Sequence, residues 1–79
     1  MRLDKYLKVS RLIKRRTVAR EACDGGRVSV NGRTAKAGYS VKEGDIVEIA
    51  FGTRNVKVEI TSVAETVRKE EAKEMYRYI

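Results

Sequence analysis

The sequence predicts a small α+β domain in which two N-terminal helices pack on a small twisted antiparallel sheet, with a further helix at the C-terminus. Three observations predict it. Apolar residues recur at helical spacing over residues 3–23. Short alternating segments separated by turn residues follow, beginning with Val28-Ser29-Val30 before Asn31-Gly32. A stretch rich in Glu, Lys, Ala and Met closes the chain, and these residues favour helix.

The first helix is predicted over residues 2–8. Leu3 and Leu7 lie four residues apart and therefore share one face. Asp4 stands near the start, where the helix dipole favours a carboxylate. A turn near Ser10 follows. Asp4 has a second possible role, to orient neighbouring arginines, and the sequence does not separate the two.

The second helix is predicted from Val18, with Thr17 as its N-cap, to Gly25-Gly26, because glycine accepts the left-handed conformation of a C-cap. Its small apolar residues fall on one face, which suits close packing on a neighbour. Cys23 belongs to that face. We interpret it as a small core residue in preference to a reactive thiol.

A hairpin is predicted over residues 28–35, because Asn-Gly is the preferred dipeptide of a type I′ turn. A second hairpin is expected from strands at residues 46–51 and 56–60, linked by residues 52–55. The C-terminal helix is predicted over residues 67–78. Its charges are mixed, so we expect it to cover the sheet as a solvated lid.

The excess of positive over negative charge is confined to the first half of the chain. The net charge is +7, yet residues 1–36 hold eleven basic and three acidic side chains, whereas residues 37–79 hold seven basic and eight acidic ones. Such segregation concentrates positive potential on one side of a small body and attracts polyanions, nucleic acid foremost. The competing interpretation is a solvated basic face that only maintains solubility.

Nothing in the composition favours catalysis or a cofactor. The chain has no histidine, its single cysteine precludes an internal disulfide, and its glycines match no phosphate-binding loop. A structural zinc site lacks its usual ligands. No apolar run is long enough to cross a bilayer. We therefore expect a monomeric, cytoplasmic, non-enzymatic protein without a metal, a cofactor or a membrane partner.

The candidate RNA-contacting residues come from the two helices, the turn between them and the following hairpin. Arginine and lysine side chains there suit phosphates, and arginine binds them bidentately. The amide groups at the start of the second helix add a further phosphate site. The candidates are Arg2, Asp4, Lys5, Lys8, Arg11, Lys14, Arg15, Arg16, Thr17, Arg20, Arg33 and Lys36.

Double-stranded DNA is the main competing ligand, but the chain shows no long recognition helix, and its aromatic residues are not interleaved with the basic cluster. Tyr6 alone lies near it. We interpret Tyr6 as packing at the edge of the core with its hydroxyl in water, in preference to base stacking.

The order of these residues resembles the S4 RNA-binding domain family. The resemblance is carried by Arg2-Leu3-Asp4-Lys5-Tyr6-Leu7, Ser10-Arg11, Arg15-Arg16-Thr17-Val18-Ala19-Arg20, Gly26-Arg27-Val28 and Val30-Asn31-Gly32. It covers residues 1–48 of a single domain that continues through residues 49–79. Without a catalytic domain, the chain is most similar to the stand-alone RqcP family of bacterial ribosome quality control.

That resemblance implies binding to obstructed large ribosomal subunits, with contacts to large-subunit rRNA and to P-site peptidyl-tRNA, in support of RqcH as it adds alanine to stalled chains. Arg2 and Arg16 are the leading contacts. Reversing the charge of Arg16 is expected to abolish binding to large subunits without changing the thermal melt.

Two alternatives remain. The chain is also similar to the fifteen-kilodalton heat-shock protein, which implies ribosome recycling without a role in tailing. A basic adaptor for acidic proteins or anionic membranes is the other, although no strongly amphipathic apolar face supports it.

Overall fold

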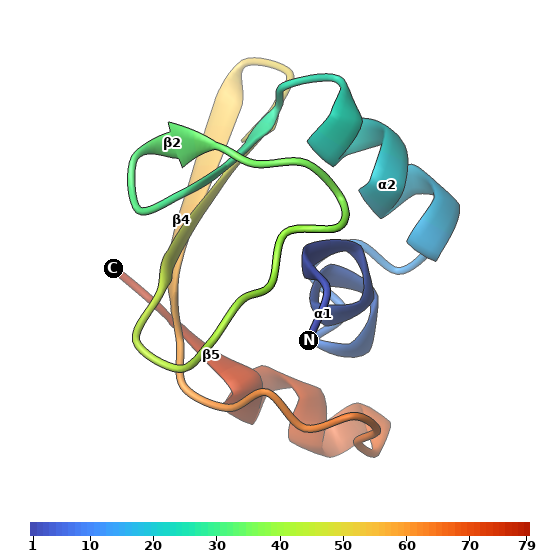
Figure 1. The fold of residues 1–79 in the computed structure, drawn as a ribbon. Helices are drawn as coiled ribbons and strands as arrows, with labels where there is room; N and C mark the ends of the chain where they lie inside the picture. Colours follow the sequence, from blue (N-terminus) through green and yellow to red (C-terminus); the bar gives the residue numbers. More distant parts are fainter.

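The computed structural model describes residues 1–79 and is an α+β fold whose helices lie on one side of a curved five-stranded sheet (Figure 1). Helix α1 (Leu3–Val9) and helix α2 (Arg16–Asp24) pack against each other. The buried side chains of α1 include Leu3 and Leu7, which confirms the predicted apolar face. The N-cap prediction is wrong: α2 begins at Arg16, one residue before Thr17, and the chain enters it through Arg15 in an extended conformation without a side-chain cap.

The turn between the helices is fixed by a few local bonds. Ser10 is buried, and its hydroxyl donates to the Leu7 carbonyl at 3.2 Å. Arg11 then adopts a left-handed backbone with φ 64°, which is uncommon outside glycine. The Ile13 amide donates to the Leu7 carbonyl at 3.1 Å, and the Ile13 side chain enters the core. The turn is therefore anchored on both sides of Arg11.

The sheet is antiparallel with the strand order β2-β1-β3-β4-β5. Its first four strands are β1 (Val28–Val30), β2 (Arg33–Thr34), β3 (Ile46–Phe51) and β4 (Arg54–Ile60). Both predicted hairpins are present. Asn31 (φ 52°) and Gly32 (φ 83°) both have the positive φ that a type I′ turn requires.

The C-terminal prediction is wrong in part. Residues 67–78 do not form one α-helix: a 3-10 helix, η1 (Lys69–Met75), is followed by strand β5 (Tyr76–Tyr78), which pairs with β4. The buried residues of η1, Ala72 and Met75, lie three apart, which matches the three-residue repeat of a 3-10 helix. The closing tyrosines favour a strand, and their pairing satisfies the edge of β4.

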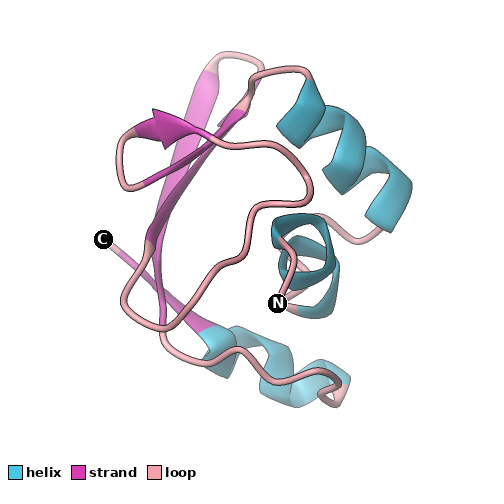
Figure 2. Cartoon of the chain, in the orientation of Figure 1, coloured by secondary structure: helices cyan, strands magenta, loops and turns pink.

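The core lies between the concave face of the sheet and the two N-terminal helices (Figure 2). Cys23 is fully buried there, as expected, and burial raises its pKa to about 11, with Asp4 and Asp24 adding to the shift. Tyr6 is also fully buried, so its hydroxyl does not reach water. It donates to the Met75 carbonyl at 2.7 Å instead and ties α1 to η1. None of the helices is long and apolar enough to span a membrane.

Candidate nucleic-acid interface

A groove of about 310 Å³ runs along α1 and the turn that follows it. Five of its nine lining residues are cationic, and a single acid, Glu65, faces them. The α1 side chains project from the surface opposite the buried leucines, and the turn adds two more cations beyond the helix end. The lining residues are Lys5, Lys8, Val9, Arg11, Lys14, Arg16, Glu65, Thr66 and Val67.

A second hollow of about 270 Å³ adjoins the groove, because Arg16 lines both. It lies where the start of α1 meets the start of α2. Its lining residues are Arg2, Asp4, Arg16, Thr17 and Arg20. The groove and the hollow together bring nine of the twelve sequence candidates onto one surface, which we call the basic face: Arg2, Asp4, Lys5, Lys8, Arg11, Lys14, Arg16, Thr17 and Arg20.

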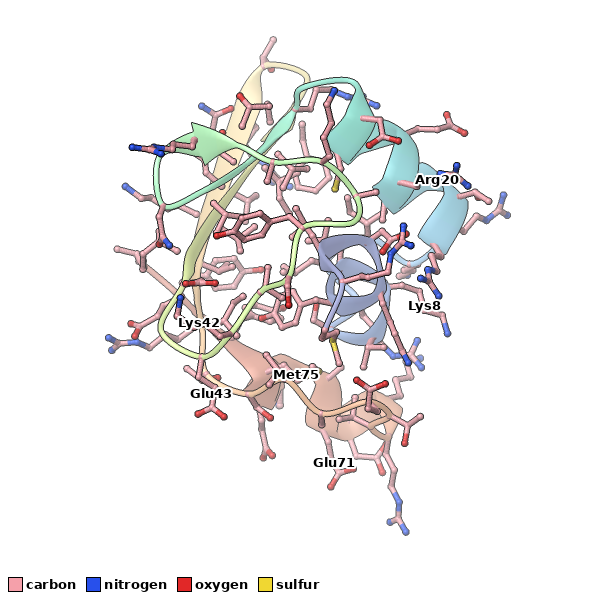
Figure 3. All side chains as sticks on the ribbon, viewed as in Figure 1. Lys8, Arg20, Lys42, Glu43, Glu71 and Met75 are labelled. Atoms are coloured by element: carbon pink, nitrogen blue, oxygen red, sulfur yellow. The ribbon has the colours of Figure 1, made fainter.

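Figure 3 shows the orientation of this surface. Lys8 on α1 and Arg20 on α2 both point away from the sheet on the same side of the molecule, whereas Lys42 and Glu43 lie on the other side. Side chains twelve residues apart in the sequence therefore share one direction. This convergence follows from the packing of α1 against α2.

Asp4 is the buried centre of the basic face. Its side chain is 3% exposed, and its two carboxylate oxygens accept from Arg2 Nε at 3.2 Å and Arg16 Nε at 3.3 Å. The Lys5 amide donates to it at 2.8 Å. Both arginines remain about half exposed, so each has donors free for another ligand. Asp4 therefore orients Arg2 and Arg16.

The pKa of Asp4 reflects this arrangement. Burial acts to raise it, but the hydrogen bonds from Arg16, Arg2 and the Lys5 amide outweigh burial and hold the pKa below its usual value. Asp4 is thus a carboxylate at neutral pH. Its charge offsets only part of the positive charge around it.

Glu65 is the one charged residue lining the groove that sequence reasoning missed. It lies in the segment after β4, sixty residues from Lys5, yet its carboxylate accepts from Lys5 Nζ at 2.6 Å. The hydrogen bond from Lys5 lowers the pKa of Glu65. No periodicity or motif marks this contact, since only the docking of the chain end beside α1 creates it.

Three cations of the basic face, Lys8, Arg11 and Lys14, form no ion pair within the chain. Their charges are uncompensated and face one groove. At the start of α2, no acid occupies the first turn, and the Thr17 and Val18 amides have no helical acceptor. These groups form a surface suited to the phosphates of a nucleic acid.

The other three candidates lie off this surface. Arg15 is exposed at the N-cap of α2 but lines neither hollow. Lys36 donates to the Asp24 carbonyl at 3.3 Å and so lies at the opposite end of α2. Arg33 belongs to β2, which Figure 1 places across the molecule from α2.

The surface holds no metal-binding constellation. No three Cys, Asp or Glu side chains anywhere in the chain lie close enough together to hold an ion. The chemistry that the geometry offers is charge-assisted hydrogen bonding to anionic oxygens.

Comparison with known proteins agrees with this geometry. Residues 1–47 match the family model described as the S4 domain. The chain is 67% identical over 76 residues to the RQC P-site tRNA stabilizing factor of Halalkalibacterium halodurans, covering 96% of this chain and 86% of that protein. It is 55% identical over 76 residues to the protein of the same name from Bacillus subtilis, covering 96% and 88%.

A solved structure extends the similarity to the fold. The trimeric Heat Shock Protein 15 of Vibrio cholerae superimposes with a TM-score of 0.93 at 34% identity, covering all of this chain and 81% of that one. The first 47 residues carry the S4 domain, and the high identity to the named factors runs through nearly the whole chain. The chain therefore belongs to the RqcP family of S4-domain proteins, the RQC P-site tRNA stabilizing factors.

Proposed function

We propose that the chain is a non-enzymatic cytoplasmic factor that binds large-subunit rRNA and the P-site peptidyl-tRNA on obstructed large ribosomal subunits. In this role it supports the alanine tailing of stalled nascent chains by RqcH. The basic face holds RNA backbone, and the protein stabilises the tRNA by contacts without acting on it chemically.

The observation that carries the proposal is the convergence of the basic face. Seven cations from α1, the turn and α2 line two adjoining hollows, against two acids. One of those acids, Asp4, orients two arginines and leaves both of them about half exposed. Such a surface recognises backbone shape more than base sequence, which suits folded RNA.

Reversal of Lys8 and Lys14 tests the proposal most cleanly, because neither side chain has a partner within the chain. We expect Lys8→Glu with Lys14→Glu to abolish co-sedimentation with large subunits at physiological salt and to leave the thermal melt unchanged. Arg54→Glu with Lys73→Glu is the control of equal charge change, since both side chains are exposed and neither forms an ion pair. Undiminished binding by the Lys8 and Lys14 variant would show that the basic face is not the RNA-binding surface.

Arg16 is a less clean target than the sequence suggested. It shares the buried Asp4 carboxylate with Arg2, so Arg16→Glu places a second carboxylate beside the first. We now expect that variant to lose both RNA binding and stability. Its effect on binding is interpretable only beside that of the Lys8 and Lys14 variant.

Ribosome recycling is the second candidate function, favoured by the TM-score of 0.93 to Heat Shock Protein 15. Deleting the gene and probing a stalled reporter separates the two. Loss of alanine tails supports the proposed role in tailing. Intact tails together with accumulated blocked subunits support recycling.

A further inference from the structure

A hollow of about 360 Å³ beside the β1–β2 hairpin is not used by the basic face. Its six lining residues include one cation, Arg33, and one aromatic residue, Tyr39, and no acid. The others are Val30, Asn31, Thr34 and Ala35. None of the six lines the groove or the hollow of the basic face. Arg33, which the sequence grouped with the helical arginines, belongs here.

Tyr39 and Arg33 both lack partners within the chain. Tyr39 is 43% exposed, and its hydroxyl forms no hydrogen bond. The one aromatic pair of the molecule is Tyr76 with Tyr78, so the ring of Tyr39 stacks on nothing. Arg33 is exposed and forms none of the six ion pairs. The hollow thus presents an aromatic ring and a guanidinium that have no stacking or ion-pair partner within the chain.

The backbone holds both residues in place. The Tyr39 carbonyl accepts from the Leu3 amide at 2.7 Å, and the Tyr39 amide donates to the Lys36 carbonyl at 3.0 Å. Arg33 is paired with Val30 in the hairpin. Because these bonds fix the backbone before any ligand arrives, binding does not have to order the main chain at this site.

A backbone contact links the segment that carries Tyr39 to the basic face. Arg2, a member of that face, forms a β-bridge with Ser40, the residue after Tyr39. An RNA strand whose phosphates contact Arg2 can therefore present a neighbouring nucleotide at Tyr39. Unpaired bases stack on tyrosine rings and arginine planes, whereas bases in a duplex are already stacked on one another.

We propose that the Tyr39–Arg33 hollow binds an unpaired nucleobase of the RNA whose backbone the basic face holds. The base stacks on the Tyr39 ring, and the Arg33 guanidinium faces its edge or the adjoining phosphate. Thr34 also lines the hollow and offers a hydroxyl group to the base. This inference rests on the proposed RNA binding and adds a preference for loops and bulges over uniform duplex.

Fluorescence anisotropy with two RNAs tests it: a blunt-ended duplex, and a hairpin with the same stem and an unpaired loop. The wild-type protein is expected to prefer the hairpin. Tyr39→Ala should weaken hairpin binding by between about fivefold and a hundredfold and leave duplex binding unchanged. Tyr39→Phe, which keeps the ring, should retain the preference, and Arg33→Gln should reduce it.

Tyr78→Ala is the matched control, because Tyr78 is more exposed than Tyr39 but lies on β5. It should bind both RNAs as the wild type does. If Tyr39→Ala keeps the full hairpin preference, or weakens both RNAs equally, the nucleobase site is disproved. The Lys8 and Lys14 variant separates the two proposals, because it should weaken binding to both RNAs. If it binds both RNAs as the wild type does, the basic face is not the RNA-binding surface, whatever the result for Tyr39→Ala.

Discussion

At the scale of single residues, the basic face depends on two acids, Asp4 within it and Glu65 beside it in the groove. Asp4 is buried between Arg2 and Arg16 and fixes their direction, whereas Glu65 is 69% exposed and pairs with Lys5 across the groove. Both reduce the net charge by one unit. Their removal is nevertheless expected to change RNA binding in opposite directions, because only one of them orients cations.

Asp4→Asn should weaken RNA binding although it makes the protein more positive. An amide at this position offers one acceptor oxygen and introduces donors toward the arginines, so Arg2 and Arg16 lose their fixed orientation. We expect a several-fold rise in the Kd for an RNA duplex and a loss of about 1–2 kcal/mol in the free energy of unfolding. Tighter binding by this variant would mean that Asp4 acts on RNA by repulsion alone.

Glu65→Gln should strengthen RNA binding. The change frees Lys5 and removes the only acid that lines the groove. If Lys5 then neutralises one more phosphate, the slope of log K against log salt should steepen by about 0.7–0.9. Glu70→Gln on η1 serves as the control of equal charge change. An equal gain in both variants would show that net charge, and not the Lys5–Glu65 pair, sets the affinity.

At the scale of elements, the sequence predicted the helices and turns whose signals lie within the element itself. The leucines of α1 and the Asn31-Gly32 turn are local features, and both predictions are confirmed. The C-terminal segment has a helical composition, but Tyr76–Tyr78 form β5. They do so because β4 offers an unpaired edge and because Tyr6 on α1 donates to the Met75 carbonyl. Those partners lie far away in the sequence, so propensity alone could not identify the strand.

Tyr6→Phe tests this long-range tie. The variant loses the buried hydrogen bond from Tyr6 to the Met75 carbonyl, which costs about 1 kcal/mol. For a domain of this size, that corresponds to a melting temperature lower by about 4–8 °C. Amide hydrogen exchange should quicken first in η1 and β5. Unchanged exchange in those elements would contradict the role given to Tyr6.

The candidate site shows the same division between local and distant signals. The cations of α1, the turn and α2 were identified from charge and spacing, since a helix–turn–helix brings nearby residues together. The structure places Arg33 and Lys36 away from the basic face, because their positions depend on how the hairpin and the following loop dock. Glu65 could not be predicted, because its contact with Lys5 spans sixty residues.

At the scale of the whole molecule, two buried carboxylates make stability depend on acid pH. Burial acts to raise the pKa of both Asp4 and Asp45, but hydrogen bonds dominate: from Arg16 and Arg2 to Asp4, and from the Lys42 amide and Asn31 to Asp45. Both pKa values therefore lie lower in the folded protein than the ordinary 3.8. Their contribution is fully present above about pH 4 to 5.

The thermal melt should accordingly be level near neutral pH and fall as the pH drops below about 4, where the unfolded chain takes up protons before the folded one. Melting curves between neutral pH and pH 2.5 measure this. Asp45→Asn should lower stability at neutral pH and flatten the acid dependence. An acid dependence identical to that of the wild type would rule out Asp45 as a contributor.

Over the whole molecule, positive charge is concentrated on one side. The basic face lies on the helical side, whereas acidic and basic side chains balance on the outer face of the sheet. Titration of the ¹⁵N-labelled protein with a blunt RNA duplex, followed by amide chemical shifts, tests this account most directly. Shifts should concentrate in α1, the turn through Lys14 and the start of α2, and should be absent from Glu48 and Lys57 on the outer face of the sheet. Shifts centred on the sheet, or spread evenly over the chain, would contradict it.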